Sequence, residues 1–220
     1  MKGVIAGAAP AAPIVDVCHE IPPRDVKVAA LFLRMSVPYF SQGALFVCVV
    51  DPGVGSKRRI LFARTKRHAF LAPDNGLLSW LPDPVLEWRC VQNEALFLPR
   101  ASATFHGRDI FAPMAARLFR GLAAARLGPQ ASDAVKLPWP EREILAIDRF
   151  GNAITSVGPP VNRVLYKGKD IPIGRTYADV AEGQAVAVIG SSGLLELSVR
   201  NGSFAARYAA ERGEIVDAGI

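Results

Sequence analysis

The longest uninterrupted apolar run of the chain, residues 44–50, stops at Asp51, Pro52 and Gly53. A membrane-spanning helix needs about 20 apolar residues, so this run is too short to cross a bilayer. A short continuous run bounded by turn residues is typical of a strand buried on both faces of a parallel sheet. Such a strand needs a helical layer on each side, and we therefore expect an α/β fold.

Alternating strands and helices are predicted around this run. Further strands are expected at residues 14–18, 60–63 and 69–71. Asp25 follows a pair of prolines and is the predicted N-cap of a helix over residues 26–39. Apolar side chains at helical spacing predict a second, amphipathic helix over residues 108–126.

The pattern of predicted secondary structure changes after the sequence Pro138-Trp139-Pro140. Short strands separated by Gly and Pro are predicted at residues 144–147, 185–189 and 194–199, with a short helix near residues 204–210. We therefore expect two domains. Residues 1–138 form an α/β domain with a mostly parallel sheet, and residues 139–220 form a small, mainly β domain.

Charge and cysteine content narrow the class of protein. Lys and Arg number 26 against 20 Asp and Glu, but these positive charges are scattered, which argues against nucleic acid as a partner. Cys18, Cys48 and Cys90 are an odd number without short spacing, so reduced, buried thiols and a cytoplasmic location are expected. The N-terminal residues make a poor signal peptide because Gly and Pro interrupt the apolar stretch.

Polar residues at the ends of predicted strands are candidates for chemistry. Asp51 follows the most apolar strand, where ligands bind in open α/β sheets, although a tight turn explains an Asp there equally well. Residues 72–78 read most simply as a helix start with an Asp or Asn cap. His106 stands before a predicted helix, but a lone His is more often structural. Because His19, His68 and His106 share no ligand spacing, we expect no metal site.

Two turns of the second domain are candidate ligand contacts. Asp148, Phe150 and Asn152 lie within five residues of one another, and Asn and Phe can bind the edge and the face of an adenine. A hairpin turn with Gly-Asn chemistry is the simpler alternative. Residues 190–193, which include Ser191, form a small-residue turn that a ligand can approach closely.

Six segments occur in a characteristic order. They are IVDVCHEIPP (residues 14–23), VVDPGVGS (49–56), APDNGLL (72–78), FHGRDIFAP (105–113), DRFGN (148–152) and GSSG (190–193). In this order the chain resembles the S-adenosyl-L-methionine hydroxide adenosyltransferases, which are adenosine-forming S-adenosylmethionine hydrolases related to the fluorinase and the chlorinase.

The resemblance implies both a reaction and an assembly. Water or hydroxide would attack C5′ of S-adenosylmethionine and release adenosine and L-methionine, without a cofactor or metal. The family's catalytic triad falls on Asp51, Arg58 and His106. Its substrate contacts fall on Phe105, Asp148, Phe150, Asn152 and Ser191. The resemblance also implies a homotrimer with its sites at subunit interfaces.

Two other functions stay open at this point. A halogenase of the same superfamily would need a dehydrated pocket of small donors in place of a charged triad. A non-catalytic sensor would bind S-adenosylmethionine or adenosine without turnover. Family members also usually open with a strand and a Thr-Asp-Phe-Gly-type turn ahead of a Met-Lys-Gly sequence. This chain starts at Met1-Lys2-Gly3, so we expect the natural start to lie about 20 residues upstream.

Overall fold

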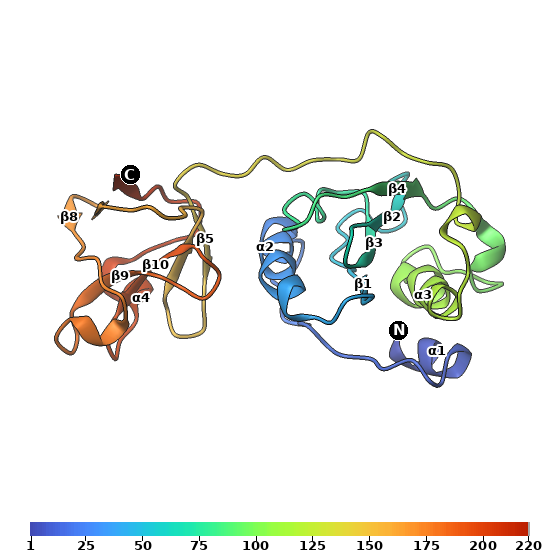
Figure 1. The fold of residues 1–220 in the computed structure, drawn as a ribbon, viewed down its shortest axis with the longest axis horizontal. Coiled ribbons are helices and arrows are strands. Elements are labelled where there is room, and N and C mark those ends of the chain that lie inside the picture. Colours follow the sequence, from blue (N-terminus) through green and yellow to red (C-terminus); the bar gives the residue numbers. More distant parts are fainter. Residues whose placement is uncertain (220) are drawn as a thin grey trace. The chain divides into compact units, whose positions relative to one another are not determined.

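In the computed structural model, which describes residues 1–219, the chain divides into two units. The first unit spans Met1–Leu137, and the second starts at Pro138. The first unit is built around a four-stranded sheet with the spatial order β1-β3-β2-β4 (Figure 1). Its strands are β1 (Leu45–Val47), β2 (Ile60–Arg64), β3 (Ala69–Pro73) and β4 (Glu87–Cys90).

Helices cover both faces of this sheet. They are α1 (Lys2–Ala8), α2 (Val26–Ser36) and α3 (Ala112–Phe119). In Figure 1, α2 lies on one side of the strands, and α3 lies on the other side with α1 next to α3. Phe62 and Leu71 pack in the apolar cluster of α3, whereas their neighbours Ala63 and Phe70 pack in that of α2. Successive side chains of a strand point to opposite faces, so both faces are apolar. The α/β class is confirmed.

The sheet is mixed rather than mostly parallel. β1 and β3 pair in parallel, whereas β2 pairs antiparallel with both β3 and β4. Residues 65–68 join β2 to β3, and a parallel crossover needs a dozen or more residues. The short connection therefore makes an antiparallel hairpin. β4 was not predicted, and β1 is shorter than the apolar run that contains it.

α2 begins where expected but ends earlier. Asp25 caps α2, because its Oδ1 accepts a hydrogen bond from the Val28 N–H at 2.9 Å. α2 ends at Ser36 and continues as a 3-10 turn, Val37–Tyr39, in which Pro38 has no N–H to donate.

The single helix expected over residues 108–126 is divided into three pieces. A π-helical turn, Gly107–Phe111, precedes α3, and a 3-10 turn, Ala124–Arg126, follows it. Between them Gly121 has a φ of +91°, a left-handed conformation that ends α3. A further 3-10 turn covers Glu94–Leu96.

The strand expected at residues 14–18 is wrong. These residues form an irregular segment, and Val15 and Val17 are 66% and 45% exposed. An extended segment becomes a strand only by pairing its backbone with a neighbour, and no strand among residues 1–219 pairs with this one.

The second unit is mainly β, as expected. One antiparallel sheet has the order β5-β6-β10-β9, and a second has the order β11-β7-β8. The elements are β5 (Ile144–Ile147), β6 (Ala153–Thr155), β7 (Arg163–Tyr166), β8 (Lys169–Asp170), β9 (Ala185–Ile189), β10 (Leu195–Val199), β11 (Asp217–Gly219), α4 (Phe204–Tyr208) and the 3-10 turn Tyr177–Asp179. The strands expected over 144–147, 185–189 and 194–199 and the short helix are confirmed. β6, β7, β8 and β11 were not predicted.

Side chains from both sheets of the second unit form its core. Leu195 and Leu197 of β10 pack with Val164 and Tyr166 of β7 and with Phe204. No helix among the described residues is long and apolar enough to cross a membrane. The three cysteines carry free thiols, and Cys90 is buried.

Candidate active site

The loop between β1 and β2 brings Asp51 and Arg58 together. Ser56 shapes this loop, because its Oγ donates to the Gly53 carbonyl at 2.7 Å and accepts from the Arg58 N–H at 3.2 Å. Gly55 has a φ of +78°, and a Cβ there would lie 2.6 Å from the Ala103 carbonyl oxygen. Only glycine permits this approach, so the loop folds back and turns Arg58 toward Asp51.

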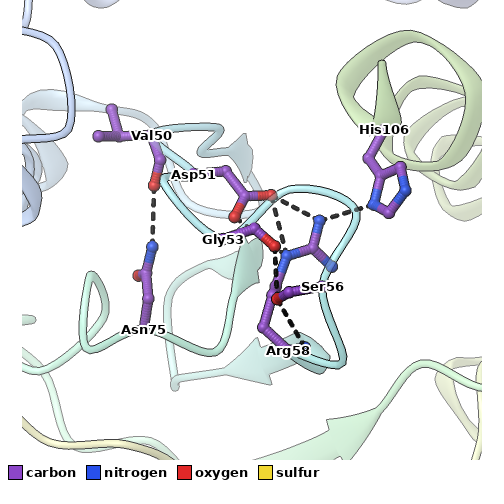
Figure 2. A network of polar contacts seen from close by, with 7 residues as sticks. All are labelled: Val50, Asp51, Gly53, Ser56, Arg58, Asn75 and His106. Atoms are coloured by element: carbon purple, nitrogen blue, oxygen red, sulfur yellow. Dashed lines mark hydrogen bonds and ion pairs between the residues drawn. The ribbon is translucent and has the colours of Figure 1, made fainter. Parts of the chain in front are cut away.

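Asp51, Arg58 and His106 form one connected polar group (Figure 2). Arg58 Nε lies 3.0 and 2.9 Å from the two Asp51 carboxylate oxygens, and Arg58 Nη2 lies 2.5 Å from Oδ2. The same Nη2 lies 2.7 Å from His106 Nδ1. The Arg58 and Asp51 side chains are only 10% and 5% exposed. A buried, fork-like ion pair holds the guanidinium in one orientation.

The contact with Arg58 determines the role of the His106 ring. A guanidinium can only donate hydrogen bonds, so Nδ1 accepts and a neutral ring carries its proton on Nε2. Burial, followed by the charge of Arg58, lowers the pKa of His106 below its usual value. The ring is therefore neutral at neutral pH, with Nε2–H available as a donor.

Close packing places His106 beside the sheet. His106 precedes the π-helical turn, and a Cβ on Gly107 would lie 3.4 Å from Val49 and 3.1 Å from the sulfur of Met1. The small residue after His106 lets this turn approach the segment that leads from β1 into Asp51.

The helix start expected at residues 72–78 is wrong, because bends and turns follow β3. Asn75 and Asp74 instead brace the loop. Asn75 Nδ2 donates to the Val50 carbonyl at 2.9 Å (Figure 2), and Asp74 accepts from Arg59 Nε at 2.8 Å. Both follow β3, the parallel neighbour of β1. Their position after a strand parallel to β1 could have placed them near Asp51, because parallel strands end at the same edge of a sheet.

Phe105, the remaining site residue of the first unit, directly precedes His106. Its ring is 55% exposed, and Arg108 Cζ lies 4.7 Å from the ring centroid. The other four predicted substrate contacts belong to the second unit.

Asp148 organises the hairpin turn between β5 and β6. Its Oδ1 accepts from the N–H groups of Phe150 at 2.8 Å and Asn152 at 2.9 Å, and its Oδ2 accepts from Asn152 Nδ2 at 2.9 Å. The Asn152 amide is therefore partly used within the turn. The Phe150 ring is 63% exposed.

Ser191 lies in an exposed turn between β9 and β10. Beneath this turn Glu196 is 8% exposed, accepts a hydrogen bond from the Tyr177 hydroxyl at 2.9 Å and packs directly against Gly190. Burial raises the pKa of Glu196, and burial together with this hydrogen bond raises that of Tyr177 to about 12. Sequence reasoning missed this pair, because a single Glu in an apolar strand carries no motif.

Comparison with known proteins identifies the family. Residues 1–128 match the SAM hydroxide adenosyltransferase N-terminal domain, and residues 142–217 match the C-terminal domain of the same name. The chain belongs to the SAM hydroxide adenosyltransferase family. The resemblance drawn from the six segments is confirmed.

Relatives of known sequence and structure agree with this membership. An (R)-S-adenosyl-L-methionine hydrolase of Thermus thermophilus is 43% identical over 221 residues, covering 92% of this chain and 86% of the relative. A fluorinase of Nocardia brasiliensis is 24% identical over 260 residues, covering 94% and 87%. The crystal structure of an uncharacterized conserved protein from Thermotoga maritima superposes with a TM-score of 0.92 at 31% identity, covering 99% and 93%.

Proposed function

We propose that the protein hydrolyses S-adenosyl-L-methionine to adenosine and L-methionine by attack of water or hydroxide on C5′. The observation that carries this proposal is the buried contact of Arg58 with both Asp51 and His106. It occurs in a family member whose relative at 43% identity is named an (R)-S-adenosyl-L-methionine hydrolase. We propose Asp51, Arg58 and His106 as the catalytic residues.

The chemistry requires a held nucleophile rather than a general acid. The leaving group is a neutral thioether departing from a sulfonium, so it needs no proton. Arg58, fixed by Asp51, offers N–H groups to the attacking oxygen, and His106 Nε2–H adds another donor. As the C5′–O bond forms, the C5′–S bond breaks; when water rather than hydroxide attacks, the proton of the new hydroxyl oxygen leaves to the solvent. Positioning the attacking oxygen in line with C5′ can contribute roughly 7–11 kcal/mol. Attack of hydroxide on a sulfonium also cancels charge, which a site with little water favours.

Substrate contacts are proposed on both units. The exposed rings of Phe105 and Phe150 suit stacking on the adenosine moiety, and the Asn152 oxygen can accept from the adenine amino group. Asp148 and Ser191 are proposed contacts of the amino-acid part.

The remaining proposals follow the sequence analysis, and the trimer follows the family resemblance. We take residues 1–138 and 139–220 as the two domains of the chain. We also propose a cytoplasmic homotrimer with active sites at subunit interfaces, which needs no cofactor or metal and binds no nucleic acid.

One labelled reaction tests the function. Purified protein is incubated with each sulfonium epimer of S-adenosylmethionine in ¹⁸O-water, with and without chloride or fluoride. The products are separated by chromatography and identified by mass spectrometry. We expect equimolar methionine and adenosine with ¹⁸O at the 5′-hydroxyl. A 5′-halogenated nucleoside would identify a halogenase, and binding without methionine release would identify a sensor. Either result would overturn the proposal.

A further inference from the structure

Asp109 is a buried carboxylate beside the candidate site that the proposed mechanism does not use. It is 1% exposed. Arg108 donates to it twice, from Nε to Oδ1 at 2.6 Å and from Nη2 to Oδ2 at 3.0 Å. The Ser102 N–H donates to the same Oδ2 at 2.8 Å. These three bonds hold the pKa of Asp109 at about 2, so the carboxylate stays charged.

The guanidinium of Arg108 also faces the ring of Phe105. Its Cζ lies 4.7 Å from the ring centroid, within the range of a cation–π contact. The Arg108 side chain is 48% exposed, and Phe105 is 55% exposed. Arg108 therefore joins a buried anion to an exposed aromatic ring.

The backbone around this pair is tied down at several points. The Phe105 carbonyl accepts from the N–H groups of both Arg108 and Asp109, each at 3.1 Å. The Asp109 carbonyl accepts from the Leu98 N–H at 2.9 Å. On its other side the segment approaches the loop of Asp51 and Arg58, where Ala103 meets Gly55.

The π-helical turn explains how neighbouring residues form a two-pronged ion pair. Side chains at positions i and i+1 of a regular α-helix point away from each other. Arg108 and Asp109 lie in the turn Gly107–Phe111, whose winding departs from the α-helix. Such turns occur frequently at functional sites.

We propose that Arg108 and Asp109 are positioning residues, which hold Phe105 as a binding surface for the adenosine moiety beside His106. This inference rests on the proposed function. Asp109 anchors both Arg108 and the segment from Ser102, and Arg108 supports one face of the Phe105 ring. The pair acts through Phe105 and does not touch the reacting atoms.

The test is a double-mutant cycle between Arg108 and Phe105. For each variant, KM and kcat are measured for the release of methionine. R108M should raise KM by about tenfold, the order expected for losing an ordered stacking surface, and should leave kcat nearly unchanged. R108K keeps a cation near Asp109 and Phe105 and should restore most of the affinity. In an F105L background R108M should have little further effect, because residues that act through one another are not additive.

Arg64 supplies a matched control in the same unit. It is also half exposed, pairs with Glu87 at 3.3 Å and lies 5.5 Å from the Phe62 ring. R64M should leave KM unchanged, so an equal rise in R64M would reveal a merely structural effect. D109N gives a second route if R108M does not fold, because it releases Arg108 while its amide oxygen can still accept from Ser102.

Three results would overturn the inference. The first is an unchanged KM in R108M, or in D109N where R108M does not fold. The second is a rise in KM from R108M that is as large in the F105L background as in the wild type. The third is a rise in KM in R64M as large as that in R108M. Failure of the proposed function is distinguishable, because it would appear in the wild type as absent methionine release. In that case the adenosine affinity of the same variants would be measured by calorimetry. Wild-type protein that does not bind adenosine would also overturn the inference.

Discussion

One nitrogen of Arg58, Nη2, lies 2.5 Å from Asp51 Oδ2 and 2.7 Å from His106 Nδ1. The guanidinium is therefore held by an anion on one side and a neutral ring nitrogen on the other. Because Asp51 neutralises the charge of Arg58, the pair can stay buried while other N–H groups of the site face an attacking oxygen.

Replacing Arg58 should remove most of the turnover. R58A leaves Asp51 as an unpaired charge beside the attacking oxygen, so we expect kcat to fall by about 100-fold or more, the scale measured for removal of a key donor. D51A and H106A should lower kcat less than R58A does, and all three should change KM little. Steady-state kinetics of methionine release measure this. Near-native turnover in R58A would refute the triad, and R64A is the control arginine.

His106 should control the acidic limb of the pH profile. Its pKa lies below the usual value of 6.5, so the ring stays neutral as the pH falls through 6.5 and is protonated only at lower pH. Protonation places an Nδ1–H opposite the donor Nη2 of Arg58, and kcat/KM, which follows titration of the free enzyme, should then fall. H106N offers an acceptor that does not titrate, and its residual activity should lack this limb. An unchanged limb in H106N would assign the titration to another group.

The second unit should contribute affinity rather than rate. F150L and N152A should each raise KM and weaken adenosine binding by about 1–3 kcal/mol, because adenine does not change during the reaction. Calorimetry with adenosine measures the loss. Phe119 is similarly exposed at 51% and lies on α3 of the first unit, so F119L is the control. Native adenosine affinity in both F150L and N152A would exclude an adenine pocket on this turn.

His68 should make the fold sensitive to acid. It is 2% exposed, neither ring nitrogen has a hydrogen-bond partner among the described residues, and its ring packs edge-on against Phe46. Burial, followed by the charge of Arg67, lowers its pKa. Below pH 6.5 the unfolded chain therefore binds a proton that the folded chain does not, and stability falls as the pH falls.

Urea unfolding at several pH values checks the prediction for His68. The free energy of unfolding of wild-type protein should decrease between about pH 7 and pH 5. H68L should show a smaller decrease. Equal slopes for the two proteins would show that other groups cause the acid sensitivity.

Elements governed by neighbouring residues were predictable from the sequence. Asp25 caps α2 because an Asp side chain can reach the N–H three residues later, whatever the rest of the chain does. β5 and β9 have the predicted bounds because turn residues flank each apolar run. The six ordered segments identified the family, and through that resemblance Arg58, to which no local pattern drew attention.

Only the tertiary structure decided features that depend on distant partners. Residues 14–18 have the composition of a strand but no paired neighbour within residues 1–219. A short hairpin connection, which apolar content does not reveal, made the sheet mixed. The contact of Arg58 with His106 joins residues 48 positions apart. The buried Glu196 and Asp109 carboxylates were equally invisible, because burial and hydrogen-bond partners arise when separate segments pack. The sequence by itself thus determined local conformation and family membership, whereas long-range packing determined which polar groups contact one another.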